Sequence, residues 1–284
     1  MVATRNPSSD LAFVRSLTPQ TVETRLRSPR GVAEYLFTGP TLYDYAVAAG
    51  MLSEQGALAS QYFVAGAEDG FTVTVAMAEV APDYTSKRVV LAYEQNGEPI
   101  RAGVRLVVPG DDLGGRSVFG VANLDLRDVP SLPLSDALHS DAIALTGDIE
   151  RPGSFDAQGL NSRPLLDVEP APSKGHGDLM RPRRRFSGPS LWDLLEGAGL
   201  RYDPALREPF LPKIIVASDA EGYAVVIAGG EIEPRFLAAP FIIATRDAKG
   251  PLGASDGGLR LIAPHDLAGA RSVKAIASLE VRDA

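Results

Sequence analysis

An internal repeat constrains the fold more than any other feature of this sequence. The segment FTGPTLYD at 37–44 corresponds to FSGPSLWD at 186–193, and RLVVP at 105–109 corresponds to RLIAP at 260–264. EVAP at 79–82 and GRSV at 115–118 likewise have counterparts in EIEP at 231–234 and ARSV at 270–273. Because the order and the spacing of these segments are both kept, the sequence predicts two diverged copies of one domain in tandem.

The repeat sets the expected domain boundaries. We expect a first domain over 1–128, a linker over 129–141 that carries two prolines, and a second domain over 142–284. The second copy opens with an apolar strand and a turn at 143–148, and the first copy has no such segment before Asn6. The opening strand of the first copy is therefore expected to be missing, and we expect the natural chain to extend upstream, with an export signal.

Local patterns in both copies indicate a β-rich α+β fold. Thr41 and Ser190 are expected to cap short helices that end at Gly50 and Gly199. β-Branched and aromatic residues between Gly and Pro turns predict the strands. The expected strands are 62–65, 71–75, 89–93 and 105–108 in the first copy and 213–217, 223–227, 241–245 and 260–263 in the second, and each copy closes on one more alternating strand.

Composition excludes several classes of protein and site. A formal charge of −8 argues against a general nucleic-acid binder, which needs clustered cations for the phosphates. The absence of cysteine excludes disulfides, thiolate metal sites and cysteine nucleophiles. No stretch of the sequence approaches the roughly 20 apolar residues of a membrane span. The common motifs of serine hydrolases, phosphate-binding loops and zinc proteases are not found.

Three segments of the second copy resemble the molybdopterin-binding domain of sulfite oxidases: LTGD at 145–148, FSGPSLWDLL at 186–195, and GARSVK at 269–274. The resemblance covers nearly all of the second copy and most of the first. It implies two tandem domains of that fold. It also implies that Arg271, Ser272 and Lys274 contact the phosphate and pterin of a molybdenum cofactor, a role for which a planar guanidinium and a lysine are suited. Since the family is often exported in bacteria, it further implies a periplasmic or exported protein, and otherwise a cytoplasmic one.

The chain departs from that family at the metal ligand. The family ligates molybdenum with one cysteine thiolate, and the corresponding stretch here, VEPAPSKG at 168–175, has none. Proline or serine cannot replace a soft thiolate without a change in metal chemistry. The leading interpretation is a non-redox binding or accessory protein, with a small anionic ligand or a protein as its partner. One alternative is a molybdopterin-dependent oxidoreductase with a different ligand set.

Cationic residues gather in the second copy, which we expect to hold any ligand site. Arg183 and Arg185 belong to the run RPRRR at 181–185, and His176 lies a few residues before it. This loop either covers an anion-binding pocket or is a solvated charged loop. Arg271 likewise either binds an anion or forms a structural ion pair, an alternative that gains weight because Arg116 recurs in the first copy.

A metal site between the domains is the third alternative. It requires several converging ligands, and His176, Asp178, His265 and Asp266 could supply them only if their two loops meet. Glu79 and Glu231 also match between the copies, and we expect each to hydrogen-bond a turn rather than to serve as an acid and base pair.

Overall fold

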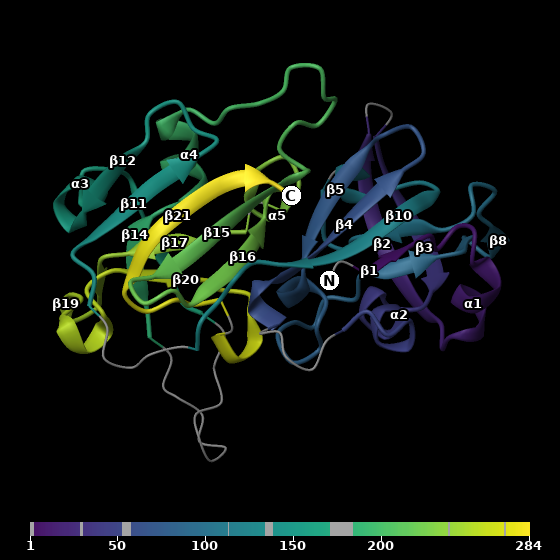
Figure 1. Ribbon diagram of the computed structural model, residues 1–284, viewed down its shortest axis with the longest axis horizontal. Helices are drawn as coiled ribbons and strands as arrows, with labels where there is room; N and C mark the ends of the chain where they lie inside the picture. The colour runs from purple at the N-terminus through teal and green to yellow at the C-terminus, as the bar shows by residue number, and fades with distance from the viewer. Residues whose placement is uncertain are drawn as a thin grey trace, which may run out of the picture.

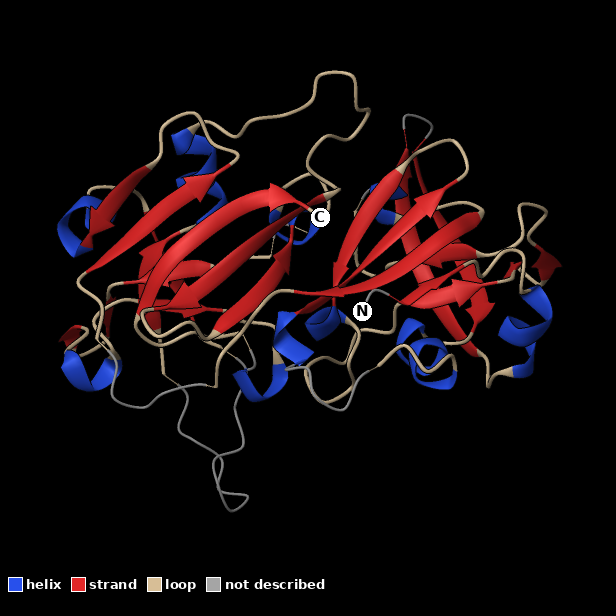
Figure 2. Ribbon diagram, viewed as in Figure 1, coloured by secondary structure: helices blue, strands red, loops and turns tan. Residues whose placement is uncertain are grey.

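The computed structural model describes residues 3–28, 31–52, 58–112, 114–133, 139–170, 184–237, 239–269 and 271–284. Strands dominate and the helices are short, so the chain has the expected β-rich character (Figure 2). The residues before the linker, here called the first half, and those after it, the second half, lie side by side along the long axis (Figure 1). Among the described helices, none is both long and apolar enough to cross a membrane.

The second half is built around a five-stranded sheet in which the closing strand is central. β21 (Ile276–Asp283) pairs in parallel with β11 (Ala142–Gly147) and antiparallel with β15 (Lys213–Asp219). The sheet is completed by β12 (Gly153–Asp156) beside β11 and β16 (Ala224–Ala228) beside β15. The β15–β21 register places Ile215 opposite Val281 and Ala217 opposite Leu279, with all four side chains buried.

The main sheet of the first half has a corresponding strand order. β10 (Val121–Asp128) pairs with β4 (Gln61–Ala67), which pairs with β5 (Thr72–Ala76). On its other side β10 pairs with β1 (Ala3–Arg5). β1 is short and runs antiparallel to β10, whereas β11 runs parallel to β21, so the strand at this place is not a direct counterpart of the opening strand of the second copy.

Each half also has a smaller sheet and a two-stranded ladder. In the first half the smaller sheet contains β2 (Gln20–Ser28), β3 (Gly31–Gly39), β7 (Glu94–Gln95) and β8 (Glu98–Pro99). The ladder there pairs β6 (Val90–Ala92) with β9 (Arg105–Val107). In the second half the smaller sheet contains β13 (Leu165–Val168), β14 (Phe186–Pro189), β18 (Arg246–Asp247) and β19 (Gly250–Pro251). The ladder there pairs β17 (Ile242–Ala244) with β20 (Arg260–Ile262). The long β2–β3 hairpin was not expected from the sequence.

The two helices expected from the sequence begin at hydroxyl caps. The Thr41 hydroxyl accepts the Asp44 N–H at the start of α2 (Leu42–Ala48), and Ser190 does the same for Asp193 in α4 (Leu191–Ala198). Gly199 ends α4 in the left-handed region, at φ +80°. The remaining helices are α1 (Leu11–Ser16), α3 (Ala157–Asn161) and α5 (Gly229–Ile232), with single 3-10 turns at 58–60, 77–79, 114–116, 254–256 and 267–269.

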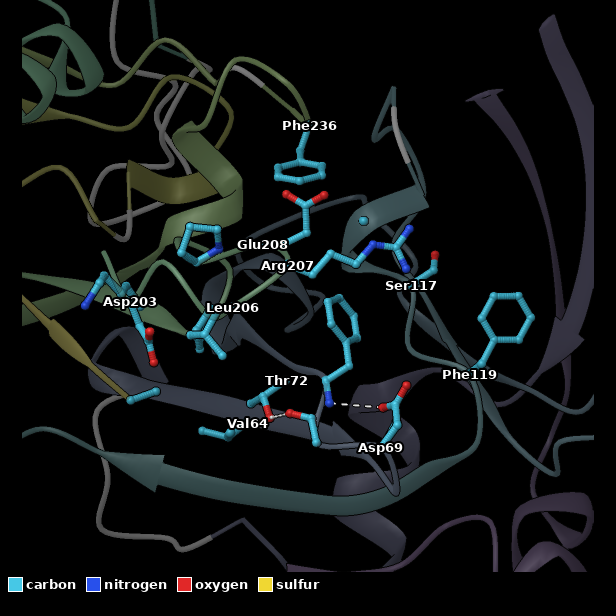
Figure 3. A pocket seen from close by; sticks show the side chains of 18 of the residues that line it. Val64, Asp69, Thr72, Ser117, Phe119, Asp203, Leu206, Arg207, Glu208 and Phe236 are labelled. Atoms are coloured by element: carbon cyan, nitrogen blue, oxygen red, sulfur yellow. Dashed lines mark hydrogen bonds between the residues drawn. The ribbon is translucent and has the colours of Figure 1, made fainter. Parts of the chain in front are cut away.

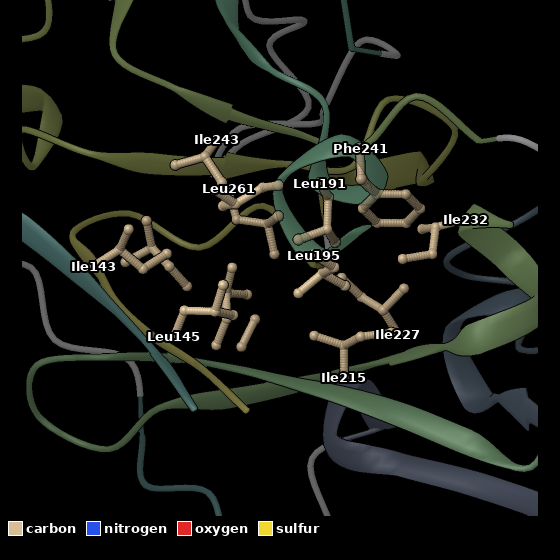
Figure 4. Packing of buried hydrophobic residues seen from close by; sticks show 14 of the residues in the cluster. Ile143, Leu145, Leu191, Leu195, Ile215, Ile227, Ile232, Phe241, Ile243 and Leu261 are labelled. Carbon is tan, nitrogen blue, oxygen red and sulfur yellow. The ribbon is translucent and has the colours of Figure 1, made fainter. Parts of the chain in front are cut away.

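Each half has its own hydrophobic core. In the second half, Leu191 and Leu195 of α4 pack against Ile215 and Ile227 of the main sheet and against Phe241 (Figure 4). In the first half, Leu42 and Tyr45 of α2 occupy the corresponding layer.

The halves contact one another through β16, β5 and α5. A smaller apolar cluster joins Tyr62 and Val64 of the first half to Ile214 and Val226 of the second. Thr74 adds hydrogen bonds to the second half: its N–H and hydroxyl donate to the Leu211 carbonyl at 2.9 and 3.0 Å, and the hydroxyl also lies 2.9 Å from the Lys213 carbonyl. This contact surface positions the groups described next.

Candidate functional site

Arg271 lies within the protein and is bound by two carboxylates. Its Nε and Nη2 donate to Asp266 at 2.9 and 2.7 Å, and Nη1 donates to Glu231 at 2.8 Å. Nη2 also pairs with Glu231 at 2.7 Å, and Nη1 reaches the Val226 carbonyl at 3.4 Å. Every nitrogen of the guanidinium thus faces a protein acceptor. Of the two alternatives for Arg271, the structure shows the ion pair.

Arg116 repeats this arrangement in the first half. Its Nε and Nη2 donate to Asp111 at 2.7 and 2.6 Å, and Nη1 donates to both oxygens of Glu79 at 3.0 and 2.8 Å. The side chain is fully buried. Lys87 adds a further contact, from Nζ to Glu79 Oε2 at 3.2 Å.

The two ion-pair clusters lie close enough to influence one another. Arg271 helps to lower the pKa of Glu79, and Glu79 helps to raise that of Glu231. Burial is the largest effect on Glu231; Arg271 opposes it, the Glu79 charge adds to it, and the resulting pKa is about 7. The pKa of Glu79 is instead lowered, to about 2. Burial raises this pKa, but the charges of Arg116 and Lys87 lower it by more. The charges of these two carboxylates are therefore coupled across the contact between the halves.

Among the described residues, the other cofactor-binding candidates have separate surroundings. Ser272 Oγ accepts the Ala263 N–H at 3.2 Å and so braces the end of β20. Lys274 is half-buried, and its charge lowers the pKa of Asp256, after a larger contribution from Arg184. Arg185 is exposed at the start of β14. His176 and Arg183 lie outside the described residues.

Within the cationic run, Arg184 rather than Arg185 forms the ion pairs. Its Nη1 lies 2.5 Å from Asp256 Oδ1 and its Nη2 lies 2.6 Å from Asp247 Oδ2. The guanidinium carbon also lies 4.9 Å from the centre of the Phe186 ring. Arg184 therefore ties the strand after the cationic loop to the β18–β19 hairpin.

The described residues contain no group of three or more His, Asp or Glu side chains arranged to hold a metal ion. Asp266 is committed to Arg271, and burial lowers the pKa of the neighbouring His265, with Lys87 adding to the effect. Asp178, like His176, lies outside the described residues.

A molybdenum cofactor of the sulfite oxidase type does not fit the residues that the structure places. The chain has no cysteine to supply the thiolate. Arg271, the arginine that the resemblance assigns to the cofactor phosphate, directs its guanidinium at Asp266 and Glu231. An arginine held this way by two carboxylates has no donor left for a phosphate.

A groove of about 960 Å³ lies where the halves meet (Figure 3). Phe71 and Thr72 of the first half line one side, and the segment 203–209 of the second half lines the other. Phe236 closes one end and Phe119 lies toward the mouth. Its size lies in the range of sites for small organic ligands, about 300–1,000 Å³.

The lining of the groove combines apolar surface with charges of both signs. Arg207, Glu208, Asp69 and Asp203 contribute charged groups, and the rings of Phe71 and Phe236 contribute apolar surface. Lys213 also lines it, but its ammonium is paired with Asp148 and Asp283 at 2.8 Å each. The groove therefore suits a ligand with an apolar body and polar groups at its ends.

The sequence interpretation did not identify two parts of this arrangement. The carboxylate partners of the arginines carried a signal, because Glu79 and Asp111 recur as Glu231 and Asp266 just as Arg116 recurs as Arg271. The groove left no such signal. It forms from residues within 69–72, 114–119 and 203–209, which are far apart in sequence.

Among solved structures, the chain is similar to the crystal structure of the sulfane dehydrogenase SoxCD from Paracoccus pantotrophus, at 17% sequence identity and a TM-score of 0.40. The similarity covers 63% of this chain and 44% of that one, so the chain spans less than half the length of that protein. No protein-family model matches the chain. No curated protein matches it either.

Proposed function

We propose that this chain is a non-redox binding or accessory protein, built on a scaffold of the sulfite-oxidase molybdopterin-binding type, whose ligand occupies the groove between the halves. The groove is the observation that carries the proposal: it has the volume of a small-molecule site, and both halves line it. The missing thiolate and the carboxylate-bound Arg271 support a function without the family's metal chemistry.

The scaffold itself is attributed to a duplication. The segments that match in sequence form strands at corresponding places: β4 and β5 in one half, β15 and β16 in the other, each beside the closing strand of its half. The arginine, its aspartate and its glutamate correspond as well. Superposition of the halves should therefore place Gly39 on Gly188 and Arg116 on Arg271.

A groove-filling variant tests the ligand proposal. Ala205 is exposed on the groove wall, so Ala205→Trp adds a large side chain to the groove without disturbing a core. A library of small metabolites is screened by thermal shift, and the compounds that stabilise the parent protein are titrated into the variant by calorimetry. We expect these compounds to lose at least tenfold in affinity.

The matched control is Val47→Trp, on an exposed face of α2 that does not line the groove. This variant should bind like the parent. Equal affinity for the parent and for Ala205→Trp would locate the ligand elsewhere. Metal analysis and pterin extraction of protein purified from its native host separate this proposal from the oxidoreductase alternative, which requires molybdenum with pterin.

A further inference from the structure

Arg105 is a buried arginine that the described residues provide with no carboxylate partner. It is 6% exposed, and its contacts contrast with those of Arg116 and Arg271. Nη1 donates to the Gln95 side-chain oxygen at a long 3.4 Å, and Nε is buried without an acceptor. A buried cation with unsatisfied hydrogen-bond donors is destabilising unless an anion or further acceptors bind those donors.

Two phenyl rings cover the faces of this guanidinium. Its central carbon lies 4.8 Å from the centre of the Phe37 ring and 3.7 Å from that of Phe119. Ring faces attract a cation, and they leave the N–H groups at the edge of the guanidinium plane. Burial lowers the pKa of Arg105 to about 10, so the group still carries its charge at neutral pH.

Gly114 lies near this edge. A Cβ on that residue would lie 3.5 Å from Leu26 Cδ1 and 4.0 Å from Arg105 Nη2. Gly114 and Phe119 line the groove and Arg105 itself does not, so Nη2 lies behind the groove wall at Gly114. Phe119, 56% exposed, forms the outer cover.

In the second half Arg260 corresponds to Arg105 in sequence, and its guanidinium carbon lies 5.6 Å from the centre of the Phe186 ring. A further arginine, Arg184, joins it at that ring and has an acid as its partner. There Asp247 pairs with Phe186 in the β14–β18 ladder, as Gln95 pairs with Phe37 in the β3–β7 ladder. Asp247 binds Arg184, which lies over Phe186. Gln95 thus takes the position of an acid but has no charge.

We propose that Arg105 binds an oxyanion or carboxylate group, using Nε and Nη2 as two parallel donors, with Phe37 and Phe119 holding the guanidinium plane. Such paired donation is the usual way in which arginine recognises two oxygens of one group. The site lies in the first half, although the sequence pointed to the second. It adjoins the groove but does not depend on the groove's occupant, since a free inorganic oxyanion satisfies it.

Two variants test the site with sulfate, phosphate and acetate as probes. Binding is measured by calorimetry and by the shift in unfolding midpoint, against chloride at equal ionic strength. We expect the parent protein to bind an oxyanion, and Arg105→Gln to weaken that binding by about ten- to a hundredfold. Gln95→Glu places a carboxylate beside Nη1 with little change in shape. It should abolish oxyanion binding and raise the midpoint measured in chloride.

Arg101→Gln is the matched control, because it removes an exposed cation four residues away and should leave binding unchanged. Ala205→Trp should also keep oxyanion binding, which separates this site from the groove ligand. If Arg105→Gln does not fold, Gln95→Glu decides the question alone. The proposal is overturned if the parent binds none of the three probes, if Gln95→Glu binds them like the parent, or if Arg101→Gln loses as much as Arg105→Gln.

Discussion

Arg116 and Arg271 illustrate how one residue type can be needed for folding rather than for a ligand. Each is almost wholly buried, and each is neutralised by an aspartate five residues before it and by a glutamate from a distant turn. Removing Arg271 leaves Asp266 and Glu231 without their counter-charge, and removing Arg116 leaves Asp111 without one and Glu79 with Lys87 alone. We expect Arg116→Ala and Arg271→Ala each to lower the free energy of unfolding by about 3–5 kcal/mol.

Denaturant unfolding of both variants measures this effect. Arg151→Ala is the control, because Arg151 is exposed: its pair with Glu150 is long, at 3.5 Å, and its Nη2 donates to the Gly197 carbonyl at 2.8 Å. Its loss should cost less than about 1 kcal/mol. A stable Arg271→Ala variant with altered anion affinity would instead support the cofactor-type role for this arginine.

Glu231 gives the molecule a pH dependence of known sign. Its pKa is about 7 in the folded protein, against 4.5 for an ordinary glutamate, so between these values the folded state holds a proton that the unfolded state has released. This contribution to stability is complete below about pH 4.5 and is lost as the pH rises through 7. One proton sets a slope of at most about 1.4 kcal/mol per pH unit.

Glu231→Gln tests the assignment, since glutamine keeps the shape and cannot ionise. Between pH 4.5 and 7, the fall in unfolding free energy should be smaller in this variant than in the parent. The exposed Glu150→Gln should show the parent's profile. Identical profiles for Glu231→Gln and the parent would mean that another group titrates in this range.

At the scale of secondary structure, the sequence predicted elements whose signals are local. The helices after Thr41 and Ser190 lie where their caps indicated, and Gly199 ends α4. β4, β5, β15 and β16 overlap the expected strands because each is short, apolar and bounded by turn residues. The β2–β3 hairpin was missed because β2 is largely polar and the apolar residues of β3, such as Val32 and Leu36, are exposed and do not alternate with polar ones.

The candidate site was harder to predict than the fold, for a physical reason. The sequence gives residue types but not which carboxylate meets which arginine, and Arg271 reads equally as a ligand-binding or an ion-paired residue. Glu231 lies forty positions away from it, and only folding brings the two together. The sequence interpretation did not single out Arg105 as a binding residue either. Only the folded structure shows that its side-chain partner is the neutral Gln95.

Two glycines fix how the small sheet of each half meets its neighbouring ladder. A Cβ on Gly39 would lie 2.0 Å from the Leu91 carbonyl oxygen, and one on Gly188 would lie 2.0 Å from that of Ile243. Relieving either clash requires a shift of the neighbouring backbone, so Gly39→Ala and Gly188→Ala should each destabilise the protein by about 1–3 kcal/mol. Gly153→Ala, with open space around it, is the control for thermal unfolding and should change little. Parent-like midpoints for the two variants would show that the strands can separate.

At the scale of the whole molecule, the two halves share enough structure to unfold together. The apolar cluster around Val64 and Val226, the Thr74 hydrogen bonds and the mutual effect of Glu79 and Glu231 all span the contact. The groove also requires both halves. Ligand binding there should therefore stabilise the assembled pair rather than either half alone.

Gly230 is where this shared structure can be weakened most selectively. It belongs to α5 of the second half, and a Cβ there would lie 2.3 Å from Arg116 Cδ of the first. The arginine cannot move aside, because Asp111 and Glu79 hold all three of its nitrogens. Gly230→Ala should thus push the halves apart at this contact; the same Cβ would also meet Leu211 Cδ2 at 2.8 Å, at the edge of the first half's core. We expect the parent to unfold calorimetrically in one transition, with equal calorimetric and van't Hoff enthalpies, and the variant to unfold in two.

Gly153→Ala should keep the single transition. Two transitions in the parent would mean that the halves are already independent, and one unshifted transition in the variant would mean that the contact at Gly230 carries no coupling.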